Sequence, residues 1–170
     1  MLPLNGTVRH MAIEALKDHL AAKLKAGVDG YHVTIPRHRI IAAVDAPENF
    51  PMPNVKIYFS ADEPPMYNGA GSRIRDKFHL VLNFNVPYQS RGGDQVKVAT
   101  DILGDLQRAM GRGYTFPVPR ADQTGDGVVV IDSYETGSAV SLGIAPTGVV
   151  DGYLGLRMEI DRDCLDPRGI

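Results

Sequence analysis

Residues 77–86 read Lys-Phe-His-Leu-Val-Leu-Asn-Phe-Asn-Val, and this stretch decides the fold class. Apolar side chains occupy every second position from Phe78 to Val86, and His79, Asn83 and Asn85 lie between them. Because successive side chains of a strand point to opposite faces, this alternation predicts a half-buried antiparallel strand. The sheet that contains it should therefore have one face against a core and one polar face.

Two amphipathic segments lie on either side of this strand in the chain. Residues 8–26 repeat apolar side chains at helical spacing, with Thr7 as a plausible N-cap and Gly27 as a left-handed stop. Residues 95–110 carry a similar stripe behind Asp94, which can cap the helix. Both segments are predicted to be helices packed on a sheet.

Further runs rich in Val, Ile and Tyr predict the remaining strands, at residues 31–35, 39–45, 55–59, 128–135, 139–144 and 149–161. In this order the predicted strands follow one another in runs and do not alternate one by one with helices. The pattern indicates an α+β fold in which two main helices pack on a largely antiparallel or mixed sheet. With 170 residues, the chain is expected to form a single domain spanning residues 1–170.

Two segments are predicted to lack regular structure. Residues 60–76 contain two prolines and two glycines without sustained periodicity, which is typical of a long flexible loop. Loops of this length are often functional, so this one is a candidate contact region. Residues 163–170 are predicted to be a C-terminal tail.

Composition excludes several classes of protein. Apolar residues make up 44% of the chain, the net charge is only −2, and Cys164 is the single cysteine, so no internal disulfide can form. No window of 18 apolar residues and no secretory leader is present, so we expect a soluble protein made in the cytoplasm. The charge is uneven, because residues 1–120 hold 15 basic and 11 acidic residues, whereas residues 121–170 hold 3 and 9.

Motifs that carry chemistry are weak in this chain. Residues 122–127 imitate the start of a calcium loop, but its twelfth position is Ser133 and lacks the bidentate glutamate. We therefore expect no metal, no cofactor and no catalytic residue. The alternative is a small-ligand enzyme of unknown reaction, with a pocket built from scattered residues, namely His32, His38, His79 and Asp45.

The order of these parts resembles the tail terminator, or tail completion, family of tailed bacteriophages. The resemblance rests on a capped N-terminal helix, strands, a long polar loop, the alternating strand 78–86, the helix 95–110 and acidic terminal strands, and it includes no signature motif. It implies a non-catalytic virion protein that assembles in the host cytoplasm as a ring, most often a hexamer. The ring would cap the tail tube, stop its growth and join the tail to the head at the neck.

The resemblance implies partners and points to regions rather than to individual catalytic positions. The partners are further copies of the chain, the tail tube protein and the head–tail connector protein, while DNA passes without specific binding and no membrane is involved. Candidate subunit or tube contacts are Met66, Tyr67, Arg73, Arg75, Tyr88 and Arg91. A candidate acidic face toward the bore or the connector is formed by Asp122, Asp126, Asp132 and Glu135. An adaptor module of a phage-like contractile or secretion apparatus is a further alternative.

Overall fold

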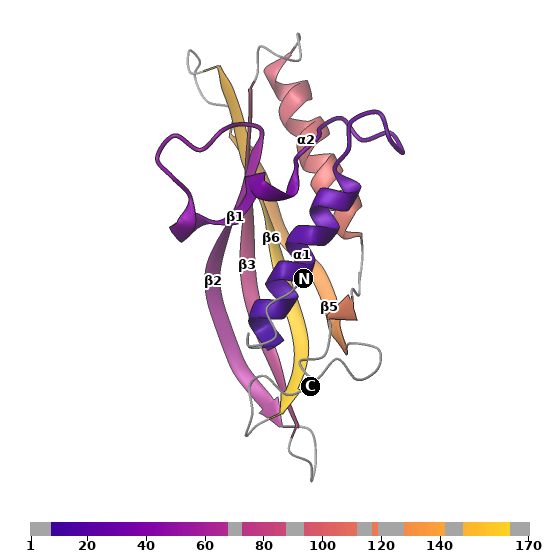
Figure 1. The fold of residues 1–170 in the computed structure, drawn as a ribbon, viewed down its shortest axis with the longest axis vertical. Coiled ribbons are helices and arrows are strands. Elements are labelled where there is room, and N and C mark those ends of the chain that lie inside the picture. The colour runs from indigo at the N-terminus through magenta and orange to yellow at the C-terminus, as the bar shows by residue number, and fades with distance from the viewer. Residues whose placement is uncertain are drawn as a thin grey trace.

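The computed structural model describes residues 8–67, 73–87, 94–111, 117–118, 128–141 and 148–163. They form a six-stranded sheet in the order β1-β2-β3-β6-β5-β4, with two α-helices on one face (Figure 1). In chain order the elements are α1 (Val8–Lys23), the 3₁₀ helix η1 (Arg37–Arg39), β1 (Ile40–Ala42), the 3₁₀ helix η2 (Ala43–Asp45), β2 (Asn54–Tyr67), β3 (Arg73–Pro87), α2 (Gln95–Met110), β4 (Pro117–Val118), β5 (Val128–Ser141) and β6 (Val149–Asp163). The predicted α+β class with a mixed, largely antiparallel sheet is confirmed, because only β1 and β2 pair in parallel.

The alternating strand β3 lies inside the sheet, between β2 and β6. Phe84 pairs with Val55 on one side and with Gly152 on the other, so apolar residues of neighbouring strands share one face. From Ile74 to Val86, every second side chain of β3 is buried and the side chains between them are partly exposed. The buried face forms the core together with both helices, and its central large residues include Leu16, Leu20, Ile57, Phe78, Leu80, Leu82, Phe84 and Ile102.

The helix boundaries follow from local capping. Asp94 accepts a hydrogen bond from the Val96 amide at 2.8 Å, and α2 covers residues 95–110 as predicted. Helix α1 ends at Lys23, three residues before the predicted end, and the left-handed Gly27 (φ +79°) follows it. The proposed cap Thr7 lies outside the described residues.

The prediction of a long loop at residues 60–76 is wrong for residues 60–67 and 73–76, and residues 68–72 lie outside the described part. Strands β2 and β3 continue to Tyr67 and from Arg73, where Met66 pairs with Arg75. The prolines and the acidic residues are accommodated by register shifts between Phe59 and Asp62 and again between Glu63 and Met66. A β-bulge places an extra residue in one strand without ending the pairing, which explains why these breakers do not end the strand. The resulting hairpin extends beyond the helix layer (Figure 1).

Several strand predictions also need correction. Residues 31–35 are buried at alternate positions but form no strand, and residues 39–45 contain only the short β1 between two 3₁₀ turns. The two strands predicted within residues 128–144 are one strand, β5, with register shifts at Val130/Asp132 and Glu135/Gly137. Strand β6 includes Asp163, the first residue of the predicted tail 163–170, and residues 164–170 lie outside the described part.

Candidate assembly surface

No described helix covers the second face of the sheet, and we call it the open face. Its side chains are those that alternate with the core residues of β2, β3 and β6, and they are mostly polar. The described members are Asn54, Lys56, Tyr58, Glu63, Met66, Arg75, Lys77, His79, Val81, Asn83, Asn85, Asp151, Tyr153, Arg157 and Glu159. The predicted polar face of the 77–86 strand is therefore a surface shared by three strands.

An ion network holds the side chains on the half of the open face nearer the hairpin tip. Arg157 of β6 donates from Nη2 to Glu63 Oε2 at 2.7 Å and also from Nε to Glu63 Oε1. His79 Nε2 lies 2.9 Å from Glu63 Oε1, and Arg157 Nη1 donates to Glu159 at 2.8 Å. Lys77 Nζ lies 3.8 Å from Glu159 and completes a chain of alternating charges. Three strands are thus joined through side chains as well as through the backbone.

The network changes the acid strength of Glu63. The Arg157 hydrogen bond, followed by the His79 hydrogen bond, lowers the pKa of Glu63 from 4.5 to about 2. A carboxylate that accepts several charged hydrogen bonds keeps its negative form at lower pH. Glu63 is therefore ionised at any pH where the protein is expected to work.

The other half of the open face carries amide side chains. Asn85 donates to Asn54 at 3.3 Å and to Asn83 at 3.0 Å, and Asn83 donates to the Gly152 carbonyl at 3.0 Å. Asn54 is buried, and its amide donates to the carbonyls of Phe50 and Pro51. The amides are thereby satisfied within the protein and fix the chain before β2.

Between these two groups the open face is apolar. Tyr58 is 46% exposed and Tyr153 is 44% exposed, and Val81 lies beside Tyr58 in the register of the sheet. Gly155 and Gly137 continue the Tyr58–Val81 row across β6 and β5 and present no side chain. Exposed aromatic groups flanked by polar side chains are typical of surfaces that contact another protein.

A small cavity lies on the helix side of the molecule, near the ends of α1 and α2. Its volume is about 350 Å³, and Lys23, Asp29, Tyr31, Arg108 and Ala109 line it. The Arg108 guanidinium lies over the Tyr31 ring, 5.0 Å from its centroid, in cation–π geometry. The cavity is therefore polar and carries more positive than negative side chains.

The loop that forms one wall of this cavity is held by a buried carboxylate. Asp105 of α2 is 3% exposed and accepts hydrogen bonds from the His32 amide at 2.7 Å and the Val33 amide at 3.0 Å. Its second oxygen lies 2.9 Å from His32 Nδ1. Asp105 thus satisfies backbone donors of residues 31–35, which have no sheet partner among the described strands.

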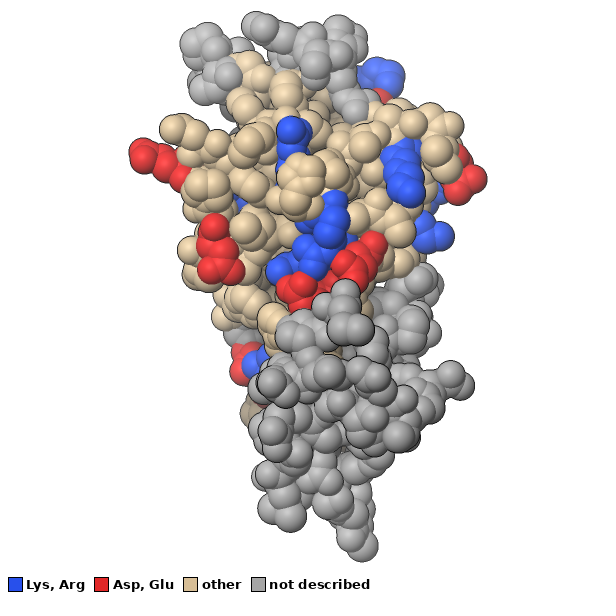
Figure 2. Space-filling view, in the orientation of Figure 1, with Lys and Arg blue, Asp and Glu red and all other residues tan. Residues whose placement is uncertain are grey.

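Acidic and basic side chains also meet over α1, where Figure 2 shows red and blue groups in contact. Glu14 pairs with Lys17 at 2.6 Å and with Arg37, which also binds Asp18. Burial raises the pKa of Glu14, but the two cations outweigh this effect and leave its pKa below the usual value. These ion pairs attach η1 to α1.

The structure places only some of the predicted contact residues. Met66 and Arg75 pair across the hairpin and face the open side, and Arg75 lies 4.0 Å from Glu159. The backbones of Tyr67 and Arg73 lie in β2 and β3, whereas Tyr88 and Arg91 fall outside the described residues.

The predicted acidic face is described at two of its four positions. Asp132 lies in β5 opposite Glu159, and Glu135 accepts hydrogen bonds from Gln107 Nε2 at 2.9 and 3.2 Å. Asp122 and Asp126 lie outside the described residues, together with the first half of the calcium-like segment 122–133.

The histidines of the alternative enzyme reading lie apart. His79 is on the open face with Glu63, whereas His32 binds Asp105 of α2 on the helix side. His38 lies in η1, and Asp45 ends η2. Within the described residues there is no group of three or more His, Cys, Asp or Glu side chains arranged to hold a metal ion.

Neither described helix is both long enough and apolar enough to span a bilayer. No protein-family model and no curated protein matches the sequence.

Sequence reasoning missed Asp105, Arg157 and the Lys23–Arg108 cavity. An aspartate within the apolar stripe of residues 95–110 was a usable signal, because a buried carboxylate requires partners. The cavity offers no such signal, since 84 residues separate Lys23 from Arg108 in the chain.

Proposed function

We propose that this chain is a structural virion protein, a subunit of a six-membered ring that caps a phage tail tube. The ring stops tube growth and presents the surface that joins the tail to the head connector. The observation that carries this proposal is the one-sided sheet, which has two helices on one face and exposed aromatic side chains on the other. Such a surface supports protein contacts, and the element order resembles that of tail terminators.

The projecting hairpin supports a contact with the tube. Met66 is 51% exposed near the end of β2, beyond the helix layer, and Arg75 lies opposite it. Arg9 of α1 fixes this hairpin to the helix layer, because it pairs with Asp62 at 2.8 Å and lies over the Phe78 ring. A braced projection loses little conformational entropy on binding, which favours a docking role.

Strand β5 and the residues before it, from position 121 on, contain four of the nine acidic residues of the C-terminal third and no basic one. Between Arg120 and Arg157 the chain has no lysine or arginine. Phosphate contacts by basic side chains create affinity for DNA, so a segment without them suits a conduit that DNA must leave freely. This face would line the bore or meet a basic surface of the connector.

The experiment is a tube-growth assay with purified tail tube protein, imaged by negative stain. With the chain present, we expect shorter tubes with a ring at one end. The Met66→Asp variant should cap fewer tubes, whereas Val96→Asp, at a similarly exposed apolar site on α2, should cap normally. Unchanged tube length and bare tube ends with the wild-type chain would contradict the proposal.

A further inference from the structure

The turn between β1 and β2 carries an exposed apolar and acidic tip. Val44 is 87% exposed, the highest value among the large apolar side chains described as exposed. Asp45 follows it in η2, is exposed, and forms no ion pair with any other described residue. We call Ala43–Asp45 the η2 knob. Exposing an apolar side chain beside an unpaired carboxylate gives the folded monomer no evident benefit.

The cavity near the ends of α1 and α2 has the complementary character. It holds two cations, Lys23 and Arg108, against one carboxylate, Asp29, and neither cation forms an ion pair with a carboxylate in the described part of the chain. Arg108 is held in place by the Tyr31 ring. A Cβ added at Gly30 (φ +78°) would lie 3.2 Å from Arg108 Nη1. The guanidinium is thus oriented in advance over the Tyr31 ring, which is itself buried.

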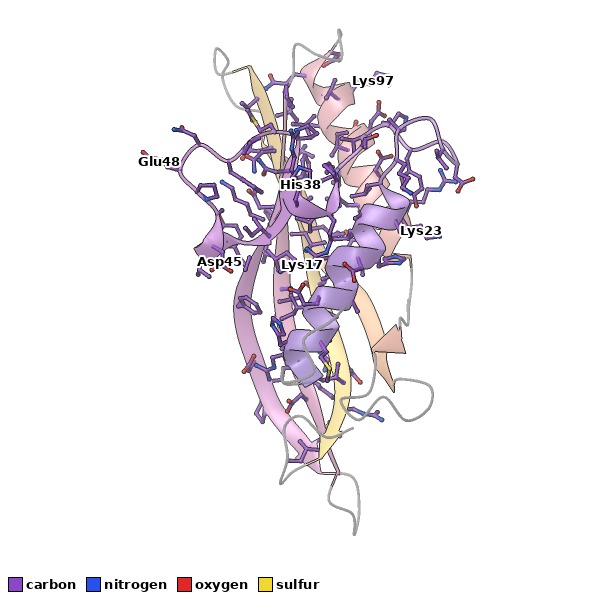
Figure 3. The ribbon with its side chains drawn as sticks, viewed as in Figure 1. Lys17, Lys23, His38, Asp45, Glu48 and Lys97 are labelled. Atoms are coloured by element: carbon purple, nitrogen blue, oxygen red, sulfur yellow. The ribbon has the colours of Figure 1, made fainter. Side chains whose placement is uncertain are left out.

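The knob and the cavity lie on opposite sides of the molecule. Figure 3 shows Asp45 and Glu48 at one margin and Lys23 toward the other, beside α2. The two features cannot meet within one chain. A head-to-tail arrangement of two copies, with a rotation between them, brings the knob of one to the cavity of the next.

From this arrangement we infer that the cavity binds the η2 knob of a second copy of this chain. The Asp45 carboxylate pairs with Lys23 and Arg108, and the neighbouring Val44 side chain loses its exposure to water in the same contact. Arginine binds a carboxylate through two parallel hydrogen bonds, which fixes orientation as well as strength. The inference rests on the proposed ring and identifies the contact between its subunits. A head-to-tail contact of this kind closes into a ring when the rotation per subunit permits.

Charge favours this contact over a two-fold one. In a knob-to-knob dimer, Asp45 and Glu48 of one copy would face the same carboxylates of its partner. In a cavity-to-cavity dimer, the four cations would meet. Like charges placed together oppose association, whereas the head-to-tail arrangement pairs opposite charges.

The test is a charge-reversal cycle followed by native mass spectrometry and analytical ultracentrifugation of the full chain. Asp45→Arg and Arg108→Asp should each weaken subunit association by about tenfold or more. The double variant should recover association, because the exchanged charges are again complementary. Lys23→Glu provides a second cavity variant that leaves the Arg108–Tyr31 contact intact, and Lys25→Glu is the control on an exposed lysine outside the cavity.

The outcomes separate this contact from the proposed function. If the wild-type chain forms rings and all three charge-reversal variants form them equally well, the knob contact is wrong and the ring proposal stands. A wild-type chain that forms only two-fold dimers, with no recovery in the double variant, also overturns the contact. A chain that stays monomeric at every concentration and leaves tube ends bare overturns both.

Discussion

Arg157 of β6 extends across β3 and donates hydrogen bonds to both carboxylate oxygens of Glu63 in β2, a residue 94 positions earlier in the chain. The pair spans a strand to which neither residue belongs. The pair therefore links β6, which follows α2 in the chain, to β2, which precedes it.

This pair predicts an acid-dependent stability. The pKa of Glu63 is about 2 in the folded protein, against its ordinary value of 4.5, so folding is favoured by its ionised form. The contribution is complete above about pH 4.5 and is lost as the pH falls toward 2. In urea unfolding at several pH values, the free energy of unfolding should fall less between about pH 4.5 and pH 2 for Glu63→Gln than for the wild-type chain. Glu48→Gln, at an exposed carboxylate, should reproduce the wild-type curve, and a Glu63→Gln curve parallel to the wild type would contradict the assignment.

Replacing Asp105 should destabilise the loop that borders the cavity. Asp105→Asn keeps the size of the side chain but removes the negative charge of the group that accepts hydrogen bonds from the His32 and Val33 amides. A lost hydrogen bond to a buried charged group typically costs about 1.5–3 kcal/mol of unfolding free energy. Asp101→Asn, one turn earlier, breaks only the exposed pair with Lys97, which is worth about 0.3–0.5 kcal/mol. Equal losses of unfolding free energy for the two variants in chemical denaturation would show that Asp105 does not stabilise the loop.

Two glycine substitutions should act in opposite directions. A Cβ at Gly152 would lie 2.6 Å from the Ala139 carbonyl oxygen and 2.6 Å from the Phe84 ring, so Gly152→Ala should lower the free energy of unfolding by about 1–3 kcal/mol. A Cβ at Gly104, inside α2, meets nothing within 4 Å. Gly104→Ala should therefore stabilise the protein by about 0.5–1 kcal/mol through helix propensity. Thermal unfolding measures both, and matching signs would contradict the packing described for β6.

Adjacent residues of β3 should respond differently to truncation. Leu82 is fully buried under the helices, and Leu82→Ala should cost about 2–5 kcal/mol of stability through lost burial and a cavity. Val81 lies on the open face and is only partly buried, so Val81→Ala should cost clearly less. A similar cost at both positions in urea titrations would mean that the open face is covered in the folded monomer.

The sequence predicts those elements whose signals are local. Helix α2 has both a capping aspartate and a glycine stop and was located correctly, whereas the alternation located residues 77–86 of β3 but not its start at Arg73. The hairpin around residues 60–76 was missed because Pro64 and Pro65 act as breakers locally, while pairing with β3 and two bulges keep the strand intact. Residues 31–35 have the alternation of a strand, but their burial comes from Asp105 and the helices.

The candidate site could be predicted only in outline. The polar face of residues 77–86 was expected, and His79 does lie on it. The partners of His79 come from β2 and β6, and the cavity joins the end of α1 to the end of α2. These contacts depend on how distant segments fold together, and no local spacing encodes them.

The bulges of β2 also bear on aggregation. Beyond Ile57, where β1 ends its pairing, the outer edge of β2 is interrupted by two register shifts, two prolines and the charged pair Asp62 and Glu63. An incoming strand would find no continuous run of backbone donors and acceptors there, so the sheet resists growth by strand addition. Fibril formation along this edge is thereby opposed, and copies of the chain are left to associate through side chains, with a geometry that can stop at a fixed number.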